Sequence, residues 1–188
     1  MRKDAIENRQ RIEQQAKMMF ERDGVDQVSM NQIAKALNIG MGTLYRHFED
    51  KSALCYALVN NDSAQLLADL DAIQSQNDDI QTIFTQAIDT FLQFKTDHRE
   101  LLHCIEMSQS KSDFRQTPLF QALHHYFYQL MDRAENEQQL TFQVDTLLNT
   151  LATQNYIFQL EERQLTNVEL RDQLVTLFLN QKNEHGGF

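Results

Sequence analysis

The apolar residues over positions 29–37 recur at spacings of three and four, which is the pattern of a short amphipathic helix. Ser29 and Gln32 stand at the spacing of a capping box, in which two residues satisfy each other's free backbone amides at the start of a helix. Asn38 and Gly40 follow the apolar face, and both residue types reach left-handed backbone angles at low steric cost. The pattern therefore predicts a helix, a sharp turn, and a second short helix over 42–47.

The second predicted helix has one side suited to a core and one suited to solvent. Leu44 and Phe48 can face the core, whereas donor side chains remain on the outer surface. Two short helices joined by a sharp turn are typical of a helix-turn-helix, whose second helix reads the major groove of DNA. Glycine turns also join helices in all-α proteins that bind no DNA, so the spacing alone leaves both interpretations open. The outer donors are Thr43, Tyr45, Arg46 and His47.

The rest of the chain predicts an all-α fold of long helices. No glycine occurs between positions 43 and 185, and Pro118 is the only proline, so residues that break helices are rare. Thr117 before Pro118 is a strong helix start signal, and Thr166 and Glu169 have capping-box spacing. The apolar periodicity predicts helices over 4–23, 50–74, 80–96, 98–110, 117–135, 141–163 and 168–182, with polar segments at 76–79 and 110–116.

Several motifs in the first third of the chain occur together in one known family. They are an apolar helix ending in Phe20, the Asp23-Gly24 stop, SMNQIA over 29–34, and above all GTLYRHF over 42–48 followed by Lys51. In this combination, residues 9–58 resemble the DNA-binding domain of the tetracycline-repressor (TetR) family of bacterial transcription regulators. The resemblance implies an N-terminal helix-turn-helix three-helix domain over 1–50 and a C-terminal helical domain over 51–188 for effector binding and dimerisation.

The resemblance also implies which side chains meet DNA. Thr43 and Tyr45 match positions that contact backbone and bases, while His47 and Lys51 match phosphate contacts. Met41 departs from the family, whose members often have a more polar residue there, so it could contact a thymine methyl group. The expected DNA contacts are Ser29, Asn31, Gln32, Met41, Gly42, Thr43, Tyr45, Arg46, His47 and Lys51.

The arginines of the first quarter have two possible roles. Arg46 could read guanine by a bidentate contact worth about 1 to 3 kcal/mol, or it could pair with a phosphate, which we favour. The early basic residues could touch the DNA backbone or form a solvated helix face, and they are Arg2, Lys3, Arg9 and Arg11.

The net charge of −10 is unevenly distributed along the chain. Residues 1–51 hold nine Lys or Arg against eight Asp or Glu, whereas residues 52–188 hold eight against nineteen. The acidity therefore belongs to the second part, which would repel DNA and so orient the protein on it.

Aromatic and methionine side chains gather between positions 84 and 131. An ordinary aromatic core explains such a cluster, but family members bury a small effector between the helices that follow the DNA-binding head. Large flat side chains and methionine line pockets for apolar ligands, whereas Asp89 or Glu106 would favour a cation. The predicted pocket consists of Phe84, Ile88, Phe91, Met107, Phe127 and Met131, with His103, His124 or Tyr156 as the polar contact.

No pattern in the chain predicts catalysis, a metal or a cofactor. There is no nucleophile motif, phosphate-binding glycine loop or acid-base pair, and the adjacent His124 and His125 face different sides of a helix. Cys55 and Cys104 match no metal-binding spacing and are expected to be reduced and buried. A charged N-terminus and the absence of a long apolar run predict a soluble cytoplasmic protein.

The last two predicted helices are expected to form a dimer interface, although their apolar stripes could also simply close the core. In the family this helix pair meets its two-fold mate as a four-helix bundle. A dimer places two recognition helices roughly 34 Å apart, or a multiple of it, on a palindrome. The predicted interface residues are Leu148, Leu151, Phe158, Leu170, Leu174 and Phe178.

These observations predict a dimeric, ligand-responsive transcriptional regulator, most simply a repressor that a small hydrophobic effector releases from a palindromic DNA operator. Activation instead of repression stays open. A non-specific architectural DNA-binding protein is a second possibility, with little sequence preference and a steep salt dependence. An all-α ligand-binding adaptor is a third. The acidic second part argues against the architectural protein, and the intact 42–48 motif argues against the adaptor.

Overall fold

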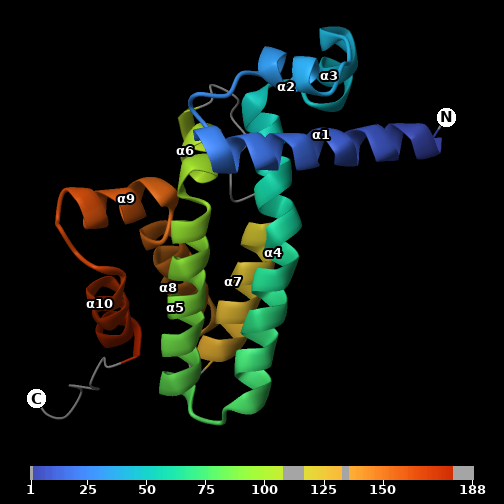
Figure 1. Ribbon diagram of the computed structural model, residues 1–188. Helices are drawn as coiled ribbons and strands as arrows, with labels where there is room; N and C mark the ends of the chain where they lie inside the picture. Colours follow the sequence, from blue (N-terminus) through green and yellow to red (C-terminus); the bar gives the residue numbers. More distant parts are fainter. Residues whose placement is uncertain (1, 108–116, 133–135, 180–188) are drawn as a thin grey trace, which may run out of the picture. The chain divides into compact units, whose positions relative to one another are not determined.

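The computed structural model describes residues 2–107, 117–132 and 136–179, and in these ranges it is built of helices without a strand (Figure 1). The predicted all-α fold is therefore confirmed. The helices are α1 (Arg2–Asp23), α2 (Met30–Ala36), α3 (Met41–His47), α4 (Lys51–Gln76), α5 (Ile80–Asp97), α6 (Arg99–Met107), α7 (Pro118–Met131), α8 (Glu137–Thr150), α9 (Thr153–Glu161) and α10 (Asn167–Leu179).

The chain divides into two compact units. Unit 1 comprises the described residues of Met1–Ala64 and Asp97–Lys111, and unit 2 comprises those of Gln65–Thr96 and Ser112–Phe188. These packing units differ from the predicted division at residue 50 in two ways. The start of α4 and the whole of α6 pack with the helix-turn-helix, and α4 contributes residues to both units.

The core of unit 1 explains why two helices of seven residues each are stable there. Ile33 of α2 and Leu44 of α3 are completely buried, together with Ile12 of α1 and Leu54 of α4. Helices this short are not stable alone in water, whereas burying each large aliphatic side chain contributes about 1.5 to 3 kcal/mol. Packing against α1 and α4 therefore holds the helix-turn-helix in shape.

The turn of the helix-turn-helix matches most of the predicted local signals. The Ser29–Gln32 capping box is present, with the Ser29 amide donating to Gln32 Oε1 over 2.7 Å. Asn38 adopts the predicted left-handed conformation with φ of 52°. Gly40 does not, because with φ of −71° it is the extended residue that precedes α3.

Unit 2 has an aromatic and aliphatic core. Phe84 and Ile88 of α5, Phe127 of α7 and Leu147 of α8 are all fully buried. The helix start at Thr117 is as predicted, because its hydroxyl accepts a hydrogen bond from the amide of Phe120. The predicted loop at 110–116 and the predicted helix ends near 135 and 182 lie outside the described residues.

The helix predicted over 141–163 is in fact two helices. It begins earlier, at α8, where the Asn136 side chain accepts hydrogen bonds from two backbone amides. It is interrupted after Thr150, because Ala152 has an extended ψ of 148° and α9 begins only at Thr153.

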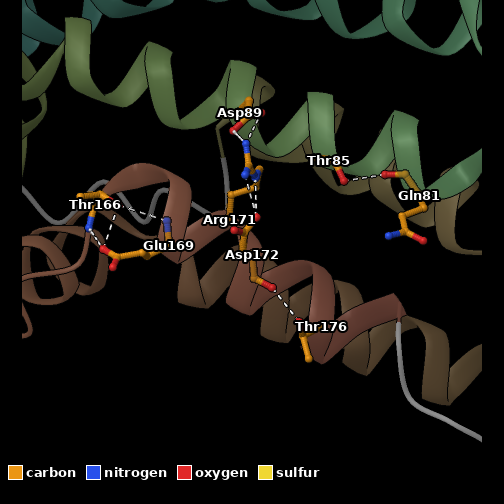
Figure 2. Close-up of polar contacts among 8 residues, drawn as sticks. All are labelled: Gln81, Thr85, Asp89, Thr166, Glu169, Arg171, Asp172 and Thr176. Carbon is orange, nitrogen blue, oxygen red and sulfur yellow. Dashed lines mark hydrogen bonds and ion pairs between the residues drawn. The ribbon is translucent and has the colours of Figure 1, made fainter.

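Helix α10 begins with the predicted capping box of Thr166 and Glu169, drawn in Figure 2. Its next turn carries Arg171, whose guanidinium lies between the carboxylates of Asp89 and Asp172, with its NH1 3.0 Å from an oxygen of Asp89. Since Asp89 belongs to α5, this ion pair fixes α10 against α5 within unit 2.

Candidate nucleic-acid interface and effector-binding core

Helix α3 presents the surface expected of a DNA-reading helix. Leu44 and Phe48 are buried and anchor the helix on the core of unit 1, whereas the Tyr45 side chain is 49% exposed. Gly42 and Arg46 are exposed, and Thr43 and His47 are half-buried. The structure thus places the predicted contacts of this helix together on its outer side.

The Arg46 guanidinium folds back along its own helix. Its Nε donates to the Gly42 carbonyl and its NH2 to the Thr43 hydroxyl, each over 3.1 Å. An arginine has five N–H donors, so three remain for a base edge or a phosphate. Thr43 and Arg46 therefore act as one preorganised donor group.

The predicted contacts at the start of α2 are exposed, but two of them already have a structural role. Ser29 and Gln32 use their side chains in the capping box, while Asn31 is exposed. Met41 is half-buried and packs against the core of unit 1, so it holds α3 in place as well as bordering the outer surface.

Two basic residues have partners that the sequence did not indicate. Arg9 lies over the Phe48 ring at 4.4 Å, pairs with Glu13, and donates to the His47 carbonyl over 3.3 Å. Arg9 therefore joins α1 to the end of α3. The Lys51 ammonium lies 5.9 Å from the centre of the Phe20 ring, in the first turn of α4.

Two polar contacts fix other segments of unit 1. The carboxylate of Glu100 in α6 accepts a hydrogen bond from the Val25 amide over 2.8 Å, in the segment between α1 and α2. The carboxylate of Asp62 in α4 receives hydrogen bonds from Lys17 and His98. Burial alone would raise the pKa of Asp62, but the hydrogen bonds from His98 and Lys17 lower it below its ordinary value.

The aromatic core of unit 2 contains most of the predicted effector pocket. Phe84 and Phe127 meet edge to face with ring centres 5.9 Å apart, and Ile88, Phe91 and Met131 are buried in the same unit. The other two predicted residues, Met107, which is 71% exposed, and His103, which is also exposed, belong to α6 in unit 1.

Tyr156 is buried, but its hydroxyl already has partners. It lies 3.0 Å from both the Asn167 side-chain oxygen and the Thr96 hydroxyl. The neighbouring Lys95 is also buried, donates to the Thr153 hydroxyl over 2.9 Å, and has its ammonium 5.6 Å from the centre of the Tyr156 ring. This cluster joins α5 to α9 and α10.

Tyr126 is the residue that the sequence reasoning missed. Its hydroxyl is buried and, among the described residues, it is the one buried side-chain polar atom without a hydrogen-bond partner. Burial, with a contribution from the Asp71 charge, raises the pKa of Tyr126 to about 12, so the phenol is neutral and can donate. The ring meets Phe127 edge to face at 5.3 Å, beside the predicted pocket residues.

Two other polar residues that were predicted to contact an effector already have partners within unit 2. His124 lies 3.4 Å from a carboxylate oxygen of Asp145 and stacks on Tyr128, so it joins α7 to α8. Asp89, proposed as a site for a cation, is paired with Arg171. The Glu106 side chain lies outside the described part of the structure.

The predicted dimer residues divide into two groups. Leu148, Leu151, Leu170 and Leu174 are buried inside the single chain, so they close the core of unit 2 and cannot meet a partner without rearrangement. Phe158 is 42% exposed and Phe178 is half-buried. Apolar side chains with more exposed surface in the same region are Phe142, Val168 and Leu177.

Other classes of site gain no support from the described residues. No group of three His, Cys, Asp or Glu within them could hold a metal ion, and none of their helices is long and apolar enough to cross a membrane. Of the two cysteines, Cys55 is buried as expected, but Cys104 is half-buried.

The fold and the outer face of α3 define a helix-turn-helix protein with an all-helical second unit. Comparison with known proteins narrows this class. Residues 12–58 match the model for bacterial regulatory proteins of the tetR family. The HTH-type transcriptional regulators SAB2452 and SAR2658 of Staphylococcus aureus are each 40% identical to the chain over 181 residues, which is 96% of this chain and 97% of the relative.

Solved structures share the fold at lower sequence identity. FadR of Thermus thermophilus, a TetR-family transcriptional repressor in complex with lauroyl-CoA, has a TM-score of 0.75 at 15% identity, over 95% of this chain and 97% of that one. FadR of Bacillus subtilis, in complex with stearoyl-CoA, has a TM-score of 0.64 at 13% identity, over 90% and 96%. The chain belongs to the TetR family of bacterial transcriptional regulators, so the prediction that it is not an enzyme is confirmed.

Proposed function

We propose that this regulator is a homodimeric repressor that leaves a palindromic operator when a small hydrophobic effector binds in unit 2. The observation that carries the proposal is the pairing of two features in one chain. Unit 1 has a reading helix with Tyr45 and Arg46 outward, and unit 2 has an apolar aromatic core in which the Tyr126 hydroxyl has no hydrogen-bond partner within the described part of the chain.

The DNA-binding part rests on α3. Thr43, Tyr45 and Arg46 enter the major groove, and the half-buried His47 and Lys51 contact phosphates on either side of it. Asn31 is free of the capping box and reaches a base edge or phosphate from α2, whereas Ser29 and Gln32 chiefly hold the helix start. Gly42 has no side chain and nothing of the protein lies within 4 Å of where its Cβ atom would be, so its backbone is open to an approach by DNA.

The effector-binding part rests on the core around Phe84, Ile88, Phe91, Phe127 and Met131. An apolar lining with one convergent donor is the usual composition of a small-molecule site. A buried hydroxyl without a partner costs about 1 to 3 kcal/mol, and an effector with an oxygen acceptor would recover this by accepting a hydrogen bond from Tyr126. The effector is therefore an apolar group that carries a carbonyl or carboxyl oxygen, a description that the acyl chain and thioester carbonyl of the acyl-CoA ligands of the FadR neighbours also fit.

The link between effector and operator is α4, which contributes residues to both units. Effector binding favours a different inclination of α4 and so a different separation of the two reading heads of the dimer. To change operator occupancy from 99:1 to 1:99, the effector must prefer the released state by about 5.5 kcal/mol.

The dimer interface is built from apolar side chains that the single chain leaves exposed on α9 and α10. Phe158 and Phe178 stay in the predicted set, and Leu177, which is 53% exposed, is added to it. The four leucines buried in the single chain support these helices from beneath. A two-fold dimer presents two α3 helices to successive major grooves.

The test of the effector site is a titration with apolar ligands that differ in their acceptor group. Dodecanoic acid, lauroyl-CoA and dodecane are added to the protein, and binding is followed by the rise in melting temperature. We expect the acid or the thioester to bind and Tyr126→Phe to weaken that binding about threefold to tenfold. Tyr128→Phe, on the same helix, is the matched control and leaves the affinity unchanged. Equal affinity in the Tyr126 variant would remove this residue from the site.

A further inference from the structure

Arg9 of α1 lies against the end of the reading helix α3. The centre of its guanidinium lies 4.4 Å from the centre of the Phe48 ring. Its NH1 donates to the His47 carbonyl over 3.3 Å, and its Nε lies 3.0 Å from an oxygen of Glu13. The last carbonyls of a helix have no partner inside that helix, so Arg9 supplies one to α3 from a different helix.

The carboxylate of Glu13 orients Arg9 and is itself held by a third helix. One of its oxygens pairs with Arg9, and the other accepts a hydrogen bond from the side-chain amide of Asn61 in α4 over 3.1 Å. The Glu13 side chain is only 13% exposed, so it has little freedom to turn away. Helices α1, α3 and α4 are therefore connected through one guanidinium and one carboxylate.

Helix α3 depends on such contacts because its own residues hold its ends weakly. It has seven residues, and Gly40 gives its start no side-chain cap, whereas α2 has a capping box. Its buried anchors are Leu44 and Phe48, and Arg9 lies over the ring of the second. Contacts to base edges are hydrogen bonds about 3 Å long with a preferred direction. A small change in the tilt of α3 therefore weakens base contacts more than phosphate contacts made by long side chains.

We propose that Arg9 is a positioning residue, which fixes α3 in the orientation that discriminates one DNA sequence from others. It acts through Phe48 and His47, and not as a phosphate contact. This inference rests on the proposed function, because only a protein that reads an operator has such discrimination to lose. Exposed ion pairs and cation–π contacts stabilise a fold only slightly, so loss of Arg9 leaves unit 1 folded and loosens α3 alone.

The hold on α3 is tested first without DNA, by hydrogen exchange of single backbone amides followed by NMR. The Phe48 amide donates to Leu44 at the end of α3 over 3.1 Å. The Leu37 amide donates to Ile33 at the end of α2, also over 3.1 Å, and is the internal reference. Arg9→Ala should speed exchange at Phe48 about twofold to fivefold and leave Leu37 unchanged. Unchanged exchange at Phe48, or equal acceleration at both amides, would overturn the proposal.

The effect on DNA is measured as a ratio, the dissociation constant for random duplex divided by that for the operator selected with the wild type. Arg9→Lys keeps the charge, but a compact ammonium cannot lie over a ring and bond two oxygens at once. We expect this variant to lower the ratio about tenfold, through weaker operator binding alone. Arg11→Lys is the matched control and should keep the ratio, because the Arg11 guanidinium bonds to Asn8 within α1. A wild-type ratio in Arg9→Lys would contradict the positioning role.

Glu13→Ala separates positioning from charge by the sign of its effect. Removing an acidic group from the DNA-binding unit raises the affinity for any duplex. Freeing Arg9 should nevertheless lower the ratio at least about threefold. An affinity that rises equally for operator and random duplex would show that only charge matters, against the proposal. If the wild type enriches no operator, the proposed function fails, while exchange of the Phe48 amide still decides whether Arg9 holds α3.

Discussion

At the scale of single residues, unit 2 contains two buried tyrosines in opposite situations. The Tyr156 hydroxyl has hydrogen-bond partners on Thr96 and Asn167, and the Tyr126 hydroxyl has none among the described residues. A buried polar group without a partner lowers stability, and such groups persist where a function needs them. Tyr156 therefore has a structural hydroxyl, whereas the proposed function assigns the Tyr126 hydroxyl to a ligand.

Removing the Tyr126 hydroxyl and removing the Tyr156 hydroxyl should change the free energy of unfolding in opposite directions. Without effector, Tyr126→Phe should raise the free energy of unfolding by about 1 kcal/mol, because an unpaired buried hydroxyl is deleted. Tyr156→Phe should lower it by about 1 kcal/mol or more, because two hydrogen-bonding groups lose a partner. Denaturant unfolding followed by circular dichroism measures both. A Tyr126 variant as destabilised as the Tyr156 variant would mean that the Tyr126 hydroxyl is already satisfied.

Asp62 should give unit 1 a stability that depends on pH. Its pKa is lowered in the folded protein, chiefly by hydrogen bonds from His98 and Lys17 against the effect of burial. A carboxyl with a lowered folded pKa stabilises the fold above its ordinary value of 3.8 and loses this as the pH falls through the lowered value.

Asp62→Asn should therefore lower the free energy of unfolding at neutral pH, by less than about 1 kcal/mol because water screens a side chain that is 37% exposed, and by progressively less below about pH 4. Unfolding curves at several pH values measure this, with the exposed Asp69→Asn on the same helix as the control. A difference from wild type that does not shrink in acid would show that the charge of Asp62 is not the cause.

Whether the contacts of a residue could be predicted depended on how far its partners lie from it in the sequence. Ser29, Gln32 and Asn38 were predictable because their partners lie within a few residues. The contacts of Arg9 with His47 and of Glu100 with Val25 join residues far apart in sequence, so only the folded chain reveals them. The DNA contacts predicted on α3 came from the family resemblance, and the structure adds that Arg46 is held by Thr43.

At the scale of elements, helix starts were predictable because capping side chains act locally, as at Thr117 and Thr166. The break between α8 and α9 was not predictable, because no glycine or proline stands there and alanine at position 152 favours a helix in isolation. The predicted dimer residues are a related case, because four of them are buried within the single chain. Periodicity identifies an apolar side of a helix, but it does not say whether the same chain or a partner covers that side.

The start of α2 offers a test that separates stability from DNA contact. Ser29→Ala should lower the free energy of unfolding by about 1 kcal/mol, because the capping hydroxyl is lost. Ser29→Asp keeps a capping oxygen and should be as stable as wild type, yet its charge should weaken operator binding by repelling phosphate. Chemical unfolding and DNA titration are measured on both variants. Full operator affinity in the Asp variant would place Ser29 away from the DNA.

The exposed apolar side chains of α9 and α10 should control dimerisation. Changing Phe158 and Leu177 together to glutamate should give a folded monomer, because both side chains are exposed in the single chain and two like charges would meet across the interface. Gln173→Glu, exposed on α10, is the matched control and should stay dimeric. Sedimentation velocity measures the result, and a double variant that remains dimeric would place the interface elsewhere.

At the scale of the whole molecule, the distribution of net charge along the chain suits the proposed regulator, in which one part binds DNA and the other binds an effector. The excess of acidic over basic residues lies beyond position 51, which leaves the helix-turn-helix as the part that approaches DNA. Family membership was predictable from the 42–48 motif, whereas the effector and operator depend on the detailed shape and donors of each site. Those details arise from packing between distant residues, as with Tyr126 and Phe127 beside Phe84.

The most direct test of the central claim is selection of binding sites from random duplex DNA by the purified full-length protein. The selected site is then titrated by fluorescence anisotropy at two salt concentrations. We predict one enriched palindrome, bound by a dimer and lost in Tyr45→Ala, because the Tyr45 side chain is exposed on the outer side of α3. The absence of any enriched sequence, with binding that depends on salt alone, would contradict a specific repressor and favour an architectural DNA-binding protein.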